Sequence, residues 1–307
     1  MLVAMEFREL RSLLAVEELA SIRDAARTCN VSAAAVHKHL KSLEAEFEVR
    51  LYEKHQGRLR LTEAGRVLVP LAREMLLNYD AAHAAIGEWK DGGRGLVRVG
   101  AGPSFSSNLL PTLIKRFRRR FPRVDVFVET GDSDHLISRL ANGSLDLIFD
   151  LSGAAAGHAN LTQVVEWEAN AGFVSARGDV PSHCTLRTLQ KAPFILFRKG
   201  TLIESLIQQH FNSLRFNPNV VMRSDSSEAI KAMVHAGLGV SVLLLWNLDG
   251  DSRSSALTVL RTDAPPLSIR MALIRMQSSY TPKAVREFIL LASNANWKHL
   301  HLASTMA

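Results

Sequence analysis

Apolar residues in the first fifty positions recur at helical spacing and are interrupted by short polar turns. The pattern predicts helices over residues 7–18, 22–28 and 33–47. Ser21 and Ser32 stand directly before the second and third of these, where a hydroxyl oxygen can accept a hydrogen bond from the first turn of a helix. Three short helices with sharp boundaries are therefore expected in this part of the chain.

The third predicted helix has an apolar face and a polar face. Its apolar stripe consists of Val36, Leu40, Leu43 and Phe47. Two short helices joined by a four-residue turn, the second apolar inside and polar outside, are typical of a helix-turn-helix. The residues expected to meet DNA are Ser21 and Ser32 at the helix starts, and Ala33, Ala34, His37, Lys38, His39 and Lys41. A three-helix bundle with a basic face would give the same periodicity.

Residues 51–62 predict a two-stranded wing beside this helix. Leu51 and Tyr52 begin one strand, and Arg58 opens a second in which basic and apolar residues alternate. A basic hairpin next to a recognition helix commonly grips the neighbouring backbone or minor groove, so Arg58 joins the candidate DNA contacts. A solvated turn is the alternative reading of this segment.

Residues 63–91 are predicted to form one long helix that begins after Thr62. Its apolar stripe, at spacings of three and four, consists of Leu68, Leu71, Met75, Asn78, Ala82, Ala85 and Trp89. One helix cannot bury such a stripe, so we expect a dimer; packing on its own domain is the alternative. Pro70 removes a backbone hydrogen bond, so a bend is expected near residues 63–66.

Residues 92–307 alternate apolar strands with amphipathic helices, which is the pattern of an α/β domain. We expect two Rossmann-like subdomains, the first from residues 92–165 and 267–307 and the second from residues 166–266. The alternation predicts parallel sheets, with a ligand bound at the carboxyl ends of the strands. The chain as a whole is predicted to be a mainly α winged helix-turn-helix domain (1–62), a linker helix (63–91) and an α/β domain (92–307).

Four polar loops follow predicted strands and open the next helices, at residues 102–104, 130–132, 198–201 and 225–227. Free backbone N–H groups at helix N-termini can bind anions, and Arg198 with Lys199 would favour a carboxylate. A small organic acid is therefore the expected ligand. Asp132 complicates this expectation, because a carboxylate repels an anion unless it is protonated or paired.

Many short runs in this sequence match one known family at the family's own spacing. In residues 5–66 they are 5–10, 21–26, 31–32, 43–44, 49–54 and 61–65; further on they are 109–111, 117–118, 121–122, 143–147 and 234–241. The chain resembles the LysR-type transcriptional regulators over nearly its whole length. The resemblance implies a periplasmic-binding-protein-like effector domain and a cytoplasmic homodimer or homotetramer. It also implies binding to double-stranded promoter DNA, action with RNA polymerase and a response to a small-molecule effector, with no other cofactor.

The resemblance also points to effector contacts. In the family a hydroxyl residue after the first strand of the effector domain contacts the ligand, and Ser104 matches it, seven residues before Pro111. Asp132, Thr201 and Ser226 lie in the other polar loops and are included as effector-binding candidates. Helix capping is the alternative role for these residues.

Two departures from the family pattern concern the DNA-reading helix. Ala33 and His37 stand where Gln and Ser are usual, and Phe47 with Glu48 replaces the usual Leu-Gly before the wing. Ala33 can offer only a methyl contact, and His37 can donate or accept. We therefore expect DNA binding with an unusual base preference.

Composition adds little to this picture. The net charge of +7 favours polyanions, yet residues 1–62 hold ten Lys or Arg against nine Asp or Glu, and the basic cluster at residues 115–123 is expected to be a solvated helix face. Cys29 and Cys184 form no CxxC pair, so neither a disulfide framework nor a metal site is expected. No run of eighteen apolar residues predicts a membrane span, and the cytoplasm is the expected location.

Two other functional classes were weighed against a regulator. An enzyme is not expected, because the sequence has no nucleophile elbow, metal cluster or phosphate loop, and Gly100 and Gly102 lack a third glycine in register. A two-lobed small-molecule-binding receptor without a DNA-binding role is the alternative, but it would leave residues 1–62 unexplained.

Overall fold

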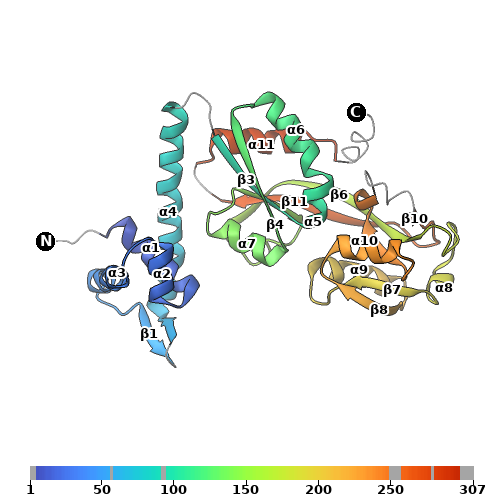
Figure 1. Ribbon diagram of the computed structural model, residues 1–307, viewed down its shortest axis with the longest axis horizontal. Helices are drawn as coiled ribbons and strands as arrows, with labels where there is room; N and C mark the ends of the chain where they lie inside the picture. Colours follow the sequence, from blue (N-terminus) through green and yellow to red (C-terminus); the bar gives the residue numbers. More distant parts are fainter. Residues whose placement is uncertain (1–4, 56–57, 91–94, 249–256, 278–279, 298–307) are drawn as a thin grey trace. The chain divides into compact units, whose positions relative to one another are not determined.

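The computed structural model describes residues 5–55, 58–90, 95–248, 257–277 and 280–297. They fall into two compact units, within residues 1–90 and 278–282 and within residues 91–277 and 283–307 (Figure 1). The first unit is mainly helical and the second is α/β. Among the described residues, no helix is both long enough and apolar enough to cross a lipid bilayer.

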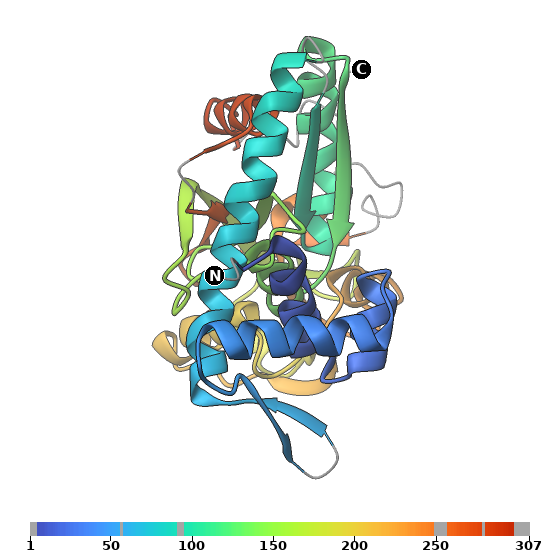
Figure 2. The same cartoon turned by 90° about the vertical axis from the view of Figure 1, so that its left-hand side faces the viewer.

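The first unit has a three-helix core with a hairpin and a long helix. Its elements are α1 (Phe7–Leu19), α2 (Ile22–Thr28), α3 (Ala33–Glu46), β1 (Tyr52–His55), β2 (Arg58–Leu61) and α4 (Glu63–Lys90). Leu10, Leu13, Val36 and Leu43 are completely buried in its core, and each such side chain stabilises the fold by about 1.5–3 kcal/mol. Figure 2 shows the antiparallel β1–β2 hairpin extending away from the helices. The predicted helix-turn-helix and wing are both present.

Helix α4 buries one apolar row in this unit and leaves another exposed. Leu68, Ala72 and Leu76 are buried in the core, whereas the side chains of Leu71 and Met75 are 48% and 41% exposed. The predicted dimer stripe is therefore wrong at its first position. Leu68 packs within its own unit, because α4 also has to cover the three short helices.

The helix runs without interruption from Glu63 to Lys90 with Pro70 inside it. The bend expected near residues 63–66 stays a prediction. The side chains of Ala85 and Trp89, which end the predicted stripe, lie outside the described residues.

The first lobe of the α/β unit has a parallel core. β3 (Gly95–Ala101) lies between β4 (Val124–Thr130) and β5 (Leu147–Leu151) and is parallel to both. The helices of this lobe are α5 (Pro103–Asn108), α6 (Leu110–Arg120), α7 (Ser133–Ala141) and α11 (Lys283–Ser293). Residues 103–120 form two helices rather than one, with Leu109 between α5 and α6. Pro111 stands in the first turn of α6, where its missing N–H leaves no helical hydrogen bond unmade.

The second lobe has its own parallel pair, β7 (Pro193–Phe197) and β8 (Asn219–Ser224). Its other elements are α8 (Leu186–Leu189), α9 (Leu202–Ser213), α10 (Ser227–His235), β9 (Ser241–Leu244), the 3₁₀ turn η1 (Leu245–Leu248) and β10 (Leu257–Val259). Phe194 and Phe211 are completely buried here, so this lobe has an aromatic interior.

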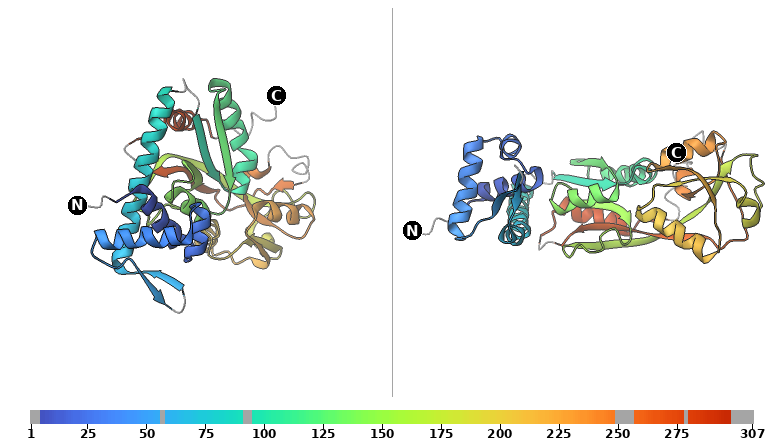
Figure 3. Two further views of the ribbon diagram at one scale, coloured as in Figure 1. Left: turned by 60° about the vertical axis from the view of Figure 1, so that its left-hand side comes forward. Right: turned by 90° about the horizontal axis from the view of Figure 1, so that it is seen from below.

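Two long antiparallel strands, β6 (Leu161–Ala176) and β11 (Leu267–Met276), pass between the lobes (Figure 3). β11 also pairs with β5, and the far half of β6 pairs with β9 and β10, all antiparallel. The prediction of purely parallel sheets is therefore wrong for these strands. β6 carries the chain from the first lobe to the second, and β11 carries it back. Neighbouring strands that run in opposite directions are antiparallel, whereas parallel neighbours need a crossover connection such as a helix.

Candidate DNA-binding surface and effector cleft

Ser21 and Ser32 begin their helices as predicted. Ser21 Oγ accepts a hydrogen bond from the Asp24 backbone N–H at 3.3 Å, and Ser32 Oγ accepts from the Ala35 N–H at 3.1 Å. Each cap satisfies a backbone donor that has no partner within the helix, which stabilises the fold by about 1 kcal/mol. Their first role is therefore to set where α2 and α3 start.

The outer face of α3 carries the residues that were predicted to reach DNA. Ala33, Ala34, His37 and Lys38 are all exposed there. The small alanines leave room at the start of the helix for close approach to a duplex. His39 does not share this face: its Nδ1 and Ser12 Oγ form a hydrogen bond of 2.7 Å, and the side chain is half-buried. Including His39 among the DNA contacts was therefore wrong, because it points toward α1.

Lys41 belongs to a junction between α3 and the wing. Its ammonium lies 2.8 Å from Glu44 Oε2, and Glu44 Oε1 accepts from the backbone N–H groups of Leu51 and Tyr52 at 2.9 and 3.4 Å. Partial burial alone would raise the pKa of Glu44, but Lys41 and the two N–H donors outweigh it and lower the pKa. Glu44 therefore stays ionised and holds the wing against α3.

The wing itself is an antiparallel hairpin in which Arg58 pairs with His55 across the two strands. Both side chains lie outside the described residues. Tyr52 anchors the base of the hairpin, because its buried hydroxyl donates to the Leu13 carbonyl at 2.7 Å. The DNA contact expected of Arg58 stays a prediction.

A cleft of about 480 Å³ opens in the α/β unit between residues of its two lobes. Three of the four predicted effector residues, Ser104, Asp132 and Thr201, line it. Ser226 is not among its lining residues, but its neighbours Asp225 and Ser227 are. The polar loops at the strand ends therefore do converge, as the alternation of strands and helices predicted.

Helix capping explains the positions of three of these residues. Asp132 Oδ1 accepts from the His135 N–H at 2.9 Å, Thr201 Oγ1 from the Glu204 N–H at 3.4 Å, and Ser226 Oγ from the Ala229 N–H at 3.2 Å. Ser104 is different, because the residue that caps α5 is Gly102. Its Oγ instead accepts a hydrogen bond from Trp246 Nε1 at 2.8 Å.

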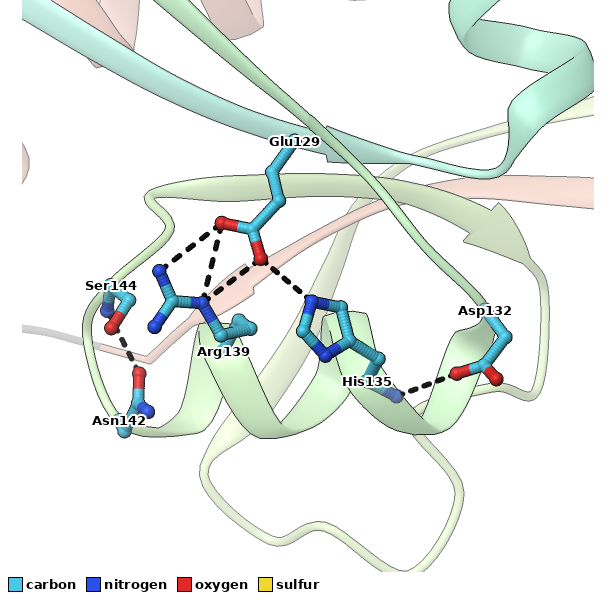
Figure 4. Close-up of polar contacts among 6 residues, drawn as sticks. All are labelled: Glu129, Asp132, His135, Arg139, Asn142 and Ser144. Atoms are coloured by element: carbon cyan, nitrogen blue, oxygen red, sulfur yellow. Dashed lines mark hydrogen bonds and ion pairs between the residues drawn. The ribbon is translucent and has the colours of Figure 1, made fainter.

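Helix α7, which carries the acidic side of the cleft, is tied to β4 through Glu129 (Figure 4). His135 Nε2 donates to Glu129 Oε1 at 2.7 Å, and Arg139 donates to the two carboxylate oxygens at 3.0 and 3.2 Å. Burial acts to raise the pKa of Glu129, but the Arg139 and His135 contacts outweigh it and hold the pKa below its ordinary value. These bonds fix the helix whose first turn presents Asp132 and Asp134 to the cleft.

The sequence reasoning missed Asp150, the last but one residue of β5. Its side chain is almost completely buried and lines the cleft. Ser133 Oγ and the Leu151 N–H both donate to Oδ1, at 2.9 and 2.7 Å, whereas the buried Oδ2 has no hydrogen-bond partner among the described residues. Burial raises the pKa of Asp150 to about 6, and the nearby Asp132 and Asp134 carboxylates add to the shift. The sequence does contain a signal for Asp150: it is a single acidic residue directly after the apolar run 147–149.

The charges around the cleft are mostly negative. Its lining holds four carboxylates, those of Asp132, Asp134, Asp150 and Asp225, against the single guanidinium of Arg198. Lys199, which was expected to favour an anion together with Arg198, is not among the lining residues. No group of three or more His, Cys, Asp or Glu side chains within the described part of the chain is arranged to hold a metal ion.

A winged helix-turn-helix joined to a two-lobed domain with a ligand-sized cleft defines the class of one-chain, ligand-responsive DNA-binding proteins. Residues 7–66 match the family described as bacterial regulatory helix-turn-helix protein, lysR family, and residues 90–296 match the LysR substrate binding domain. The chain belongs to the LysR family of bacterial transcription regulators.

Individual relatives agree with this assignment. The chain is 28% identical over 242 residues to the transcriptional dual regulator GltC of Bacillus subtilis (strain 168), covering 78% of this chain and 80% of the relative. It is 26% identical over 279 residues to the HTH-type transcriptional activator CmpR of Synechocystis sp., covering 90% of each. These relatives are regulators and not enzymes, which confirms that expectation. The match of residues 7–66 also sets aside a receptor without a DNA-binding domain.

Solved structures of full-length LysR-type proteins share the fold. Full-length OxyR from Pseudomonas aeruginosa superposes with a TM-score of 0.71 at 22% identity, covering 95% of this chain and 96% of that one. The LysR family transcriptional regulator CbnR gives a TM-score of 0.64 at 20% identity, covering 95% and 100%. The predicted order of a winged helix-turn-helix, a long helix and a two-lobed α/β domain is confirmed.

Proposed function

We propose that this protein regulates transcription by binding double-stranded promoter DNA through α3 and the wing, and that a small molecule in the cleft changes this binding. One observation carries the proposal. The same chain presents an exposed helix face with the small Ala33 and the polar His37 and Lys38, and a cleft of about 480 Å³, which lies within the usual size range of ligand pockets. A helix with a small, polar outer face beside a hairpin is suited to the major groove.

The proposal includes a homodimer or a homotetramer built through α4. Leu71 and Met75 form an exposed apolar row on this helix, and a second copy of α4 would remove both from water. Two copies would also place two α3 helices for the two half-sites of a promoter. Action with RNA polymerase and a cytoplasmic location belong to the same proposal.

An organic acid is one candidate for the effector. Arg198 lines the cleft and can bind a carboxylate through two parallel hydrogen bonds. The N-termini of α7 and α9 also open at the cleft and favour negative charge, but Asp132 and Thr201 already cap them. The support for an anion therefore rests mainly on Arg198.

Binding of the full-length protein to labelled duplexes from the DNA flanking its own gene tests the regulatory role. We expect at least one duplex to bind about tenfold or more tightly than a scrambled duplex, with an affinity that falls as salt rises. Lys38→Ala should weaken binding, whereas Arg286→Ala, an exposed basic residue on α11, should not. A protein that shows no salt-dependent binding to any of these duplexes is not such a regulator.

A further inference from the structure

The cleft contains a buried carboxylate with an unmet hydrogen-bonding requirement. Asp150 is 8% exposed, and Ser133 and the Leu151 N–H satisfy only its Oδ1. Its Oδ2 has no partner within the described part of the chain. A buried carboxylate oxygen without a donor is unfavourable by itself, so this group is suited to a ligand that brings a donor.

The surrounding charges determine which kind of donor the cleft favours. Asp132 and Asp134 lie close enough to Asp150 to raise its pKa, and all three carboxylates come from the first lobe. Asp225 adds a fourth from the second lobe. A negative ligand group placed beside them would be repelled, whereas a positive group would relieve the repulsion among them.

The rest of the lining is apolar and aromatic. Phe105 and Phe149 stack with ring centroids 4.5 Å apart, and Trp246 meets Phe105 edge-on at 6.0 Å; all three line the cleft. The faces of aromatic rings attract cations and pack against hydrocarbon chains, whereas they disfavour a carboxylate placed over the ring. The lining thus combines acidic groups with a surface for an apolar carbon chain.

We propose that the effector is an organic cation whose protonated amine binds at Asp150, between the first-lobe carboxylates, with its carbon chain against the aromatic side chains. This inference rests on the proposed function, since it names the chemical class of the effector in the same cleft. Arg198, on the second lobe, also lines the cleft and can bind a carboxylate on the far end of the same molecule, so amino acids with a second amine belong to the class. Dicarboxylates do not.

Thermal unfolding and calorimetric titration of the full-length protein test the proposal with matched probes. The amines are 1,4-diaminobutane, 1,5-diaminopentane, agmatine, L-ornithine and L-lysine. The counterparts are pentanedioate and hexanedioate, which have no amine, and L-norleucine, which keeps the α-amine of L-lysine but lacks its side-chain amine. We expect at least one amine to raise the melting temperature and to bind about tenfold or more tightly than the two dicarboxylates; if that amine is L-lysine, it should also bind more tightly than L-norleucine.

Variants of the carboxylates separate this result from general charge effects. Asp150→Asn should weaken binding of that amine by about tenfold or more, because a hydrogen bond to a charged group is lost. Asp134→Asn, at an exposed lining position, should weaken it by less. Asp125→Asn removes an exposed carboxylate of β4 that does not line the cleft and should leave binding unchanged.

Three results would overturn the proposal. They are stabilisation by the dicarboxylates rather than the amines, stabilisation by no amine in the panel, and amine binding that survives Asp150→Asn undiminished. None of these results would contradict the proposed regulatory role, which is tested separately by salt-dependent binding of the same protein preparation to duplex DNA. Loss of duplex binding with amine binding intact would instead overturn the proposed function alone.

Discussion

Trp246 donates its indole N–H to Ser104 Oγ at 2.8 Å, although the two residues are 142 positions apart in the chain. Ser104 lies in the first turn of α5, directly after β3, and Trp246 lies in η1, directly after β9. Both line the cleft. The hydrogen bond therefore joins the two lobes at the ligand site itself, so any ligand that contacts Ser104 also affects this connection.

Ser104→Ala should destabilise the protein by about 1–3 kcal/mol, because the buried indole N–H loses its acceptor. Urea unfolding of the α/β unit followed by tryptophan fluorescence measures the change. Ser107→Ala, an exposed serine on the same helix, is the matched control and should change stability by less than about 0.5 kcal/mol. Equal effects of the two substitutions would show that the Ser104 hydrogen bond contributes nothing to stability.

Asp150→Asn should make the ligand-free protein more stable at pH 7.5. The pKa of Asp150 in the folded state, about 6, lies above the ordinary value of 3.8, so the folded state binds the proton more tightly than the unfolded state. The folded protein therefore becomes less stable as the pH rises from about 4 through 6 and Asp150 ionises. The difference of 2.2 units corresponds to at most about 3 kcal/mol. The unpaired amide of Asn will reduce this gain.

Melting temperatures of wild type and Asp150→Asn between pH 4 and 8 measure this gain. The two curves should separate as the pH rises and converge near pH 4. A variant that is less stable than wild type at pH 7.5 would mean that Asp150 stabilises the folded state even without a ligand, contrary to the burial of its unpartnered oxygen.

Glu129→Gln should have an effect of the opposite sign to Asp150→Asn: relative to wild type, it should lose stability as the pH rises. The pKa of Glu129 is lowered in the folded state, where burial is outweighed by Arg139 and His135, so its stabilisation is present above the ordinary carboxyl pKa and is lost as the pH falls through the lowered value. The variant should lose about 1 kcal/mol or less at neutral pH, because Arg139 and His135 are partly exposed. Melting curves of variant and wild type should converge on acidification, and a gap that widens instead would contradict this account.

His37→Ala should change the sequence preference of DNA binding more than its dependence on salt. His37 is exposed on the outer face of α3, where it can read base edges. Lys38→Ala should instead weaken all sequences about equally and reduce the salt slope by about one. Binding of both variants to a set of single-base-substituted duplexes at several salt concentrations distinguishes the two roles. If His37→Ala altered only the salt slope, His37 would be a phosphate contact.

Leu71→Glu should shift the protein toward the monomer, because it places a charge in the exposed apolar row of α4. Light scattering after size-exclusion chromatography measures the molar mass. Glu74→Gln removes an exposed carboxylate from the same helix without changing the apolar row and should leave the oligomer intact. An unchanged mass for Leu71→Glu would place any subunit interface elsewhere.

Local sequence was enough to locate most of the secondary structure of the DNA-binding half. α2 has the predicted bounds, and α1 and α3 differ from prediction by a single residue each at their ends. The reason is that Ser21 and Ser32 end the preceding turns through hydrogen bonds to backbone groups three residues away. Such bonds depend on near neighbours in the chain and therefore leave a readable pattern.

The sequence could not reveal contacts between distant residues. His39 was assigned to the DNA face because its neighbours are polar, but a hydrogen bond to Ser12, 27 positions away, turns it inward. β6 was not among the predicted strands, and most of its length is paired with β11, about a hundred residues later in the chain. Leu68 was assigned to the apolar stripe of a dimer interface, but it is buried in the core of its own unit.

By itself, the sequence determined the family, the order of the units, the starts of the helices and the loops that meet at the cleft. The family follows from short runs of matching residues, and the other three depend on local hydrogen bonding or on the period of apolar residues. Only the tertiary structure decided the electrostatic character of the cleft, because it buries Asp150, brings Asp132 and Asp134 close to it and adds Asp225 to the same lining. Charge interactions depend on distance in space and on exclusion of water, and neither is written in the spacing of residues along a chain.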